Sequence, residues 1–481
     1  MVSARIARGQ YKSSVRILKA SMVYAMAAGG LAAAVMWFGA DFFAGAMQMP
    51  YSRYALRTLA PTIWIMAFLG VLRGYFQGTG TMVPTAVSQI IEQIVNAAVS
   101  IGAAWFLFQE GLKANLVRGD TEYSYAFGAA GGTIGTGAGA LAALAFCAFL
   151  MFNYRRTLRR QCRKDQTGVE ESYGRLSAIL TMTILPIVLS STVYNISSVL
   201  DNFFFGQGMA YLGRSDAIAT EWGIFGKYHT LFMIPVAIAN ALSSSLIPSL
   251  SRAVASRDKG QVLDKTATAI RFSMLIAIPA TVGLTVLSAP INNLLFPSKN
   301  GDLLIRITAV GASAVAFYSL STVSNAILQG INHMKTPLKN SAIALAVHVV
   351  LLLVMLYGLK WGIYAVIFSN ILFALLMCVL NGRSIRRYLD YRQEYRKTFV
   401  LPFFSSVLMG AAAFGVSALL EYLLPEGRLW LAVQVFAAVT AAAAVYGAGL
   451  LKLGAVDEVE LYGMPAGRRL VRIARKFRLL P

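Results

Sequence analysis

The feature that most constrains this chain is a series of twelve apolar stretches. A helix needs roughly 20 mostly apolar residues to cross about 30 Å of hydrocarbon. Hydrophobic residues form 57% of the 481 and charged residues only 13%, which leaves no room for a large water-soluble domain. The sequence therefore predicts an all-α polytopic membrane protein with about twelve transmembrane helices. They lie near residues 20–46, 57–76, 86–108, 126–152, 178–206, 221–248, 269–297, 303–329, 339–358, 361–381, 400–423 and 428–452.

The net charge of +22 is divided unequally between the two ends of these stretches. With the N-terminus in the cytoplasm, the segments on that side carry 31 Lys and Arg, and those on the other side carry 8. Cytoplasmic loops of membrane proteins are enriched in Lys and Arg. We therefore expect a multi-pass protein of the cell membrane with both termini cytoplasmic. The basic charge is expected to meet anionic membrane lipids and not nucleic acid.

Several kinds of site find no support in the sequence. The three cysteines show no paired spacing, and the three histidines lie too far apart to suggest a metal centre. The glycine-rich run 128–140 lacks the Lys-Ser/Thr of a phosphate loop. Its Gly131, Gly135 and Gly139 are four apart, which is typical of closely packed membrane helices. We expect no cofactor, no metal and no enzymatic activity.

Two segments of the chain are similar to one another. Residues 72–99 and 324–351 each contain Gln-Gly, a Met five residues after the Gln, and then a Pro. A second likeness, between 5–22 and 253–274, has nearly the same offset of about 250 residues. Six helices separate the copies, so both have one orientation and are expected to be related by an axis along the membrane normal.

The repeat predicts how the chain is organised. We expect a truncated N-terminal lobe of four helices over 1–160 and a C-terminal lobe of six helices over 161–385. Two additional helices over 386–455 and a basic amphipathic cytoplasmic tail over 456–481 should follow. The first two helices of the second lobe have no counterpart in the first. The sequence is therefore expected to represent the last twelve helices of a fourteen-helix design.

Four motifs carry a resemblance to a known family. They are LRGYFQGTGTMVPTAVSQIIEQIV (72–95), FMIPVAIANALSSSLIPSLSRAVA (232–255), AIRFSMLIAIPATVGLTVL (269–287) and AILQGINHMKTP (326–337). The chain resembles the polysaccharide-biosynthesis and stage V sporulation protein B group of lipid-linked oligosaccharide flippases. That group includes lipid II flippases and belongs to the multidrug/oligosaccharidyl-lipid/polysaccharide exporter superfamily.

The resemblance implies a fold and a function. Two lobes would form a central cavity and alternate between inward-open and outward-open states, moving a lipid-linked sugar such as lipid II across the membrane. Some relatives carry an Arg before a Leu-Pro in their eighth helix. The comparable segment here has Lys227 and His229 before Ile234-Pro235.

A polar stripe inside one apolar helix is the strongest candidate for the cavity wall. Charged and polar side chains are costly at membrane depth, so each requires a partner or water. The stripe either lines a cavity that binds sugar hydroxyls or a cation, or forms a hydrogen-bonded seam between helices. Its members share one helical face and are Gln89, Glu92, Gln93, Asn96 and Ser100.

Other polar residues extend the candidate cavity. Asp201 and Asn202 lie near the outer end of the 178–206 stretch, where Asp201 is expected to pair with a base such as Lys227 or to take part in cation coupling. Lys227 and His229 open the next stretch and are candidate anion-binding groups or interfacial side chains. Arg73 and Gln77 lie near a cytoplasmic helix end, where Arg73 either contacts a phosphate or extends to the interface. We include all six in the cavity.

The leading function is the flipping of a lipid-linked sugar precursor, of the lipid II or polysaccharide/teichoic type. It would be driven by a coupling cation or the membrane potential acting on a charge. The alternatives are a multidrug or cation antiporter of the same superfamily, an inactive or regulatory truncated paralogue, and a membrane glycosyltransferase. The short outer loops disfavour the last of these.

Overall fold

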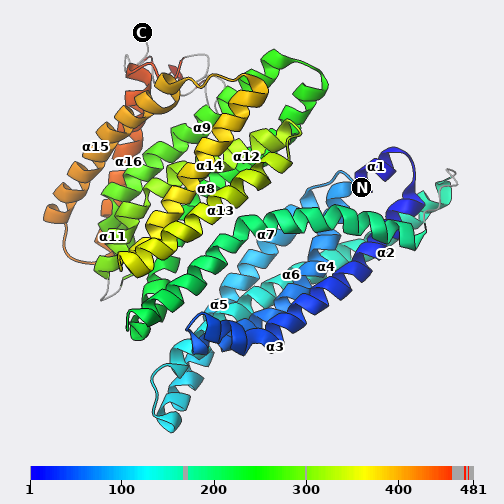
Figure 1. The fold of residues 1–481 in the computed structure, drawn as a ribbon, viewed down its shortest axis with the longest axis horizontal. Coiled ribbons are helices and arrows are strands. Elements are labelled where there is room, and N and C mark those ends of the chain that lie inside the picture. Colours follow the sequence, from blue (N-terminus) through cyan, green and yellow to red (C-terminus); the bar gives the residue numbers. More distant parts are fainter. Residues whose placement is uncertain are drawn as a thin grey trace. The chain divides into compact units, whose positions relative to one another are not determined.

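The computed structural model describes residues 2–165, 172–297 and 301–457, together with Arg468, Val471, Arg472 and Arg475. All regular structure in these residues is helical (Figure 1). Ten described segments are long and apolar enough to cross a membrane, or eleven if the bent pair α11 (Gly301–Gly311) and α12 (Ser313–Gly330) is one span. The remaining expected span lies in α7 (Tyr173–Tyr211), a helix of 39 residues. The prediction of an all-α polytopic membrane protein is confirmed.

The chain divides into two compact units, Met1–Ser191 and Thr192–Pro481, with the division inside α7. After a short first helix, the first unit continues with a segment that is helical from Tyr11 to Ala46 and contains a π-helical turn at Ala25–Gly29. Its elements are α1 (Val2–Ala7), α2 (Tyr11–Tyr24), α3 (Gly30–Ala46), a 3-10 turn (Pro50–Ser52), α4 (Arg53–Gly78), α5 (Val83–Arg118), α6 (Tyr123–Lys164) and the first part of α7.

The long α5–α6 hairpin is held together by glycines on α6. A methyl group added at Gly139 would lie 2.5 Å from the carbonyl oxygen of Glu92, and one added at Gly135 would overlap Ser100. Only glycine permits so close an approach of two helices. The close packing predicted from the four-residue glycine spacing is therefore confirmed. The α4–α6 contact combines an apolar cluster, with Leu72 and Cys147 among its buried residues, with a polar contact in which the hydroxyls of Thr58 and Thr133 lie 2.6 Å apart.

The second unit contains the rest of α7 and the helices up to the C-terminal hairpin. The hairpin α15–α16 packs against the end of α9 through a buried cluster that includes Leu287, Met409 and Ala438. The unit's other elements are a 3-10 turn (Ser215–Ala217), α8 (Ile218–Ala255), α9 (Lys259–Val286), α10 (Ser288–Leu295), α11, α12, α13 (Lys335–Leu353), π-helical turns (Val354–Gly358 and Arg396–Val400), α14 (Ile363–Leu389), α15 (Leu401–Leu423) and α16 (Arg428–Lys452).

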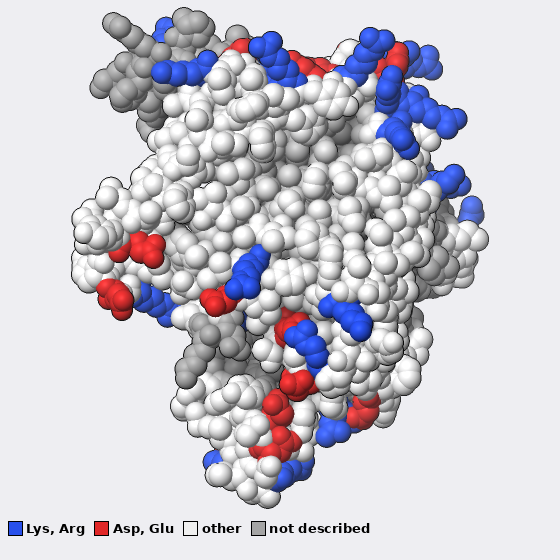
Figure 2. All heavy atoms as spheres, turned by 60° about the vertical axis from the view of Figure 1, so that its left-hand side comes forward, with Lys and Arg blue, Asp and Glu red and all other residues white. Residues whose placement is uncertain are grey.

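The outer surface of these helices is apolar. Phe38 is 82% exposed and Leu116 is 87% exposed, and many other large hydrophobic side chains are also exposed. The face in Figure 2 shows a broad band without charged side chains below a rim rich in Lys and Arg. Exposed apolar surface of this extent is typical of contact with lipid. Most of the expected amphipathic tail, 456–481, lies outside the described residues.

We predict that Gly135→Ala lowers the stability of the protein because the added methyl group forces α5 and α6 apart. Overpacking of a tight interface costs about 1–3 kcal/mol. Gly132→Ala is the matched control, since a methyl group there meets no atom within 4 Å. The thermal unfolding midpoints of the two variants in detergent would test this, and equal midpoints would show that the hairpin does not depend on close approach.

Candidate functional site

An ion pair joins α4 to α5 in the first unit. Arg73 Nη2 lies 2.7 Å from Glu92 Oε2, and the two side chains are 13% and 14% exposed. Arg73 Nε donates a second bond, of 2.8 Å, to the hydroxyl of Ser88. Glu92 is nine residues into α5, about 14 Å from its start. Each charge therefore has a partner at a depth where an isolated charge would be costly.

The pair extends toward the α4–α5 turn through a neutral contact. Gln77 Nε2 donates to the hydroxyl of Thr85 at 3.2 Å. Ser88, which receives the bond from Arg73, donates in turn to the Thr85 carbonyl at 2.8 Å. The structure thus brings together Arg73, Gln77 and Glu92, which the sequence placed on two separate helices.

The polar stripe of α5 divides into two parts. Glu92 faces α4, while Asn96 accepts a 2.9 Å bond from Ser100, whose hydroxyl also lies 2.8 Å from the Gly132 carbonyl of α6. Gln89 and Gln93 are exposed on the first unit. One edge of the stripe is therefore a hydrogen-bonded seam between helices, and on the other edge the amides of Gln89 and Gln93 have no hydrogen bond among the described residues.

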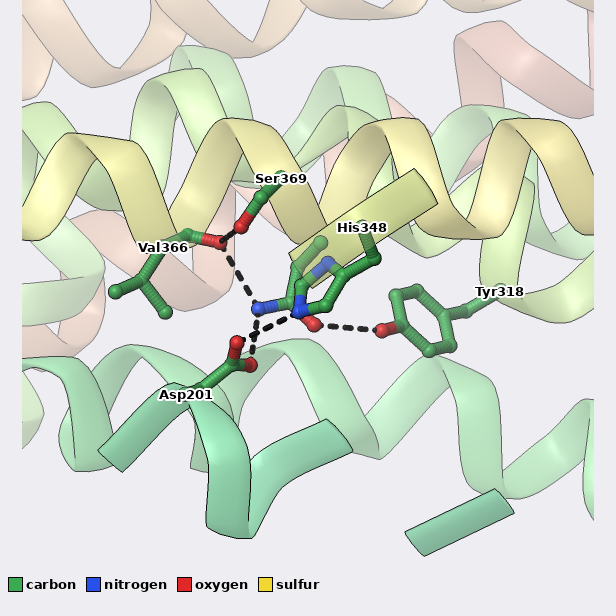
Figure 3. Close-up of polar contacts among 6 residues, drawn as sticks. Asp201, Tyr318, His348, Val366 and Ser369 are labelled. Carbon is green, nitrogen blue, oxygen red and sulfur yellow. Dashed lines mark hydrogen bonds and ion pairs between the residues drawn. The ribbon is translucent and has the colours of Figure 1, made fainter. Parts of the chain in front are cut away.

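A buried network occupies the second unit (Figure 3). Asp201 Oδ1 of α7 lies 2.7 Å from His348 Nε2 of α13, and the side chains are 3% and 0% exposed. The other carboxylate oxygen accepts a 2.8 Å bond from Asn370 Nδ2 of α14. Tyr318 of α12 donates to Asn370 Oδ1 at 2.9 Å. Four helices thus meet at one titratable pair.

The partner expected for Asp201 was wrong. Lys227 Nζ lies 5.9 Å from the centre of the Phe296 ring, and His348 takes the place beside the carboxylate. Sequence reasoning missed His348, Asn370 and Tyr318 as members of this site. The repeat offered one signal, because an offset of 252 residues places His348 opposite the stripe residue Asn96.

The remaining candidates lie apart from this network. His229 is exposed on α8, with its ring between those of Phe225 and Phe232 at 6.2 and 5.7 Å. Asn202 follows Asp201 on α7, and its buried Oδ1 has no hydrogen-bond partner among the described residues. The described chain holds no group of three His, Cys, Asp or Glu side chains that fits a metal ion.

Comparison with known proteins identifies the family. Residues 11–434 match the family described as lipid II flippase MurJ. The lipid II flippase MurJ of Bacillus subtilis (strain 168) is 25% identical over 99% of this chain and 87% of its own length. Stage V sporulation protein B of the same organism is 24% identical over 98% of this chain and 87% of its own length.

Solved structures show the same fold. A lipid II flippase MurJ in an inward closed conformation has a TM-score of 0.64 at 15% identity, covering 94% of this chain and 87% of its own. An inward-facing multidrug resistance MATE family transporter also has a TM-score of 0.64 at 15% identity, covering 81% and 84%. With the match over residues 11–434, the chain belongs to the lipid II flippase MurJ family, a family of multi-pass membrane transporters.

Proposed function

We propose that this protein moves lipid II, or a related lipid-linked sugar precursor, across the cell membrane by alternating access. The observation that carries the proposal is the family match over residues 11–434. The polar groups at membrane depth in the first unit support it, because a lipid-linked sugar requires hydrogen-bond partners while its lipid tail stays in hydrocarbon. Transport of this kind breaks no covalent bond.

The α4–α5 cluster is the proposed cavity wall of the first unit. Gln89 and Gln93 present amides that suit sugar hydroxyls. Arg73 Nη2 donates a hydrogen bond to Glu92, and Arg73 Nε donates one to Ser88. The third nitrogen, Nη1, has no hydrogen bond among the described residues. A diphosphate carries more negative charge than one carboxylate, so it competes with Glu92 for the guanidinium. Exchange of partners at Arg73 would then accompany binding and release.

In the second unit, we assign further contacts to Lys227, His229 and Asn202. The Lys227 ammonium lies at the Phe296 ring and has no ion pair in the described residues, so it remains available to an anion. The orphaned Asn202 Oδ1 is an acceptor that a ligand hydroxyl would satisfy.

The Asp201–His348 pair is the proposed place where a coupling cation acts. Two titratable groups in a buried network change their net charge when a proton is gained or lost, and that change is costly without water or a partner. Because α7, α12, α13 and α14 all contribute to the network, the packing of these helices responds to the change. A proton is the cation that the imidazole suits best.

We also propose the orientation derived from the loop charges, with both termini in the cytoplasm. The 31 to 8 division of Lys and Arg supports it. Anionic lipids of the inner leaflet would meet the basic segments on that side.

A multidrug or cation antiporter is the second candidate, supported by the fold shared with MATE transporters. Such a protein would use an acidic side chain to bind a cationic drug. Glu92 already has Arg73 as its partner, which disfavours this role. An inactive or regulatory paralogue is the third candidate, and the absence of lipid II movement in reconstituted vesicles would favour it.

The central prediction concerns Arg73 and Glu92 in vesicles that contain the purified protein and labelled lipid II. E92Q leaves the guanidinium without a counter-charge and should lower stability by about 2 kcal/mol. The R73Q/E92Q double variant replaces the pair with two amides and should regain most of that stability. Its rate of lipid II movement should nevertheless fall at least tenfold, since a charge-assisted contact worth about 1.4 kcal/mol is lost.

The double variant separates the two interpretations of this pair. Stability regained with transport lost places the pair at the substrate. If transport recovers together with stability, the pair is only an architectural link and the proposed cavity wall is wrong.

We predict that the D201N/H348Q double variant removes the dependence of transport on pH between about 5 and 8, because both groups of the buried pair are replaced by amides. The control is N381A, which disturbs a buried neutral network in the same unit, where Asn381 bonds to Asn325, Asn340 and Ser324. N381A should lower stability and keep the pH dependence. An unchanged pH profile in D201N/H348Q would place the coupling cation elsewhere.

The orientation predicts which surface cysteines react from outside the cell. In a chain whose native cysteines are replaced, E122C should react with a membrane-impermeant thiol reagent in intact cells. S256C should react only after the membrane is opened. Both positions are exposed, so burial does not explain a difference. The reverse pattern would invert the topology.

A further inference from the structure

A groove on the first unit lies apart from the cavity residues described above. It has a volume of about 960 Å³ and runs between α2 and α6 over the side of α4. Its floor is apolar, with Met22, Phe68, Leu72, Leu144 and Phe152 among the lining side chains. One end carries four basic side chains, Lys19, Arg155, Arg159 and Arg163.

The basic end belongs to a segment of α6 with six basic residues, of which Arg156, Arg160 and Lys164 are not among the side chains that line the groove. Arg155, Arg159 and Arg163 are four residues apart and therefore lie in one row along α6. Like charges at this spacing repel one another. All four bases are exposed, and none forms an ion pair with an acidic side chain of the described chain. No acidic side chain is among the described residues that line the groove.

The dimensions of the groove match one leaflet of a bilayer. On α6 the apolar part extends from Leu144 to Phe152, a rise of about 12 Å. Half of the hydrocarbon core is about 15 Å thick. The basic row continues the same face from Arg155 to Arg163, for about another 12 Å. An apolar channel one leaflet deep therefore leads directly to a row of cations.

We propose that this groove is a discrete binding site for an anionic diacyl phospholipid of the inner leaflet. The acyl chains lie on the apolar floor, and the phosphate of the headgroup accepts hydrogen bonds from the arginines of α6 and from Lys19. A bound phosphate offsets the mutual repulsion of the row. The site goes beyond the proposed transport function and does not depend on it.

The test measures how many lipid molecules the purified full-length protein retains, by mass spectrometry of the intact complex titrated with phosphatidylglycerol or phosphatidylcholine. We expect phosphatidylglycerol to bind more tightly. R155Q/R159Q/R163Q should weaken its binding roughly tenfold or more, since each Lys or Arg adds to the attraction of anionic lipid. A148F, which fills the exposed floor beside Leu144 without changing charge, should weaken both lipids.

The control is R383Q/R386Q/R387Q, which removes three exposed arginines from the same side of the membrane on α14, outside the groove. This variant should retain phosphatidylglycerol like the unmodified protein. If the control loses phosphatidylglycerol to the same extent, general surface charge holds the lipid. If A148F binds both lipids like the unmodified protein, the lipid does not lie in the groove. Both results overturn the proposal, as would displacement of phosphatidylglycerol by a polyprenyl diphosphate at lower concentration, which would make the groove a substrate site.

Discussion

Charge at membrane depth must be compensated, and the internal design of both units follows from that constraint. Water is absent from the hydrocarbon, so an unpaired guanidinium or carboxylate there costs several kcal/mol. In the first unit Arg73 and Glu92 compensate one another across α4 and α5. In the second unit Asp201 is compensated by His348 and Asn370. Because compensation ties helices together, any ligand or proton that changes a partner also changes how those helices pack.

At positions related by the internal repeat, the two units carry different side chains, and buried charge is compensated by different residues in each. An offset of 252 residues places α5 opposite α13, with Glu92 opposite Ala344 and Asn96 opposite His348. Ala344 is fully buried and packs against Phe373, so no charge remains at that position. The titratable group of the second unit stands one turn further along. The first unit therefore holds an Arg–Glu pair, and the second holds an Asp–His pair whose histidine lies one turn further along the repeat.

The sequence predicted local features well and long-range partners poorly. Apolar length predicts membrane helices because each helix satisfies its own backbone, and the spacing of Gly131, Gly135 and Gly139 predicts a close helix contact for the same local reason. The sequence predicts both Arg73 and Glu92 as cavity residues, but on separate helices and without their contact. Arg73 lies five residues before the end of α4 and Glu92 nine residues after the start of α5, so the long arginine side chain spans a difference in depth of about 6 Å. His348 lies 147 residues from Asp201, and no periodicity connects them.

The excess of basic residues illustrates the difference between counting charges and placing them. Membrane topology depends on how many Lys and Arg lie on each side of the membrane. It does not depend on which face of a helix carries them. The groove between α2 and α6 shows an order that topology does not require. Arg155, Arg159 and Arg163 form one row, and that row continues the line of the apolar side chains below it. A second row at the same spacing, Arg156, Arg160 and Lys164, lies beside it on α6 outside the groove lining, so like charges are concentrated along this whole segment. Alignment of like charges over an apolar channel is explained by a ligand that is itself anionic at one end and apolar at the other.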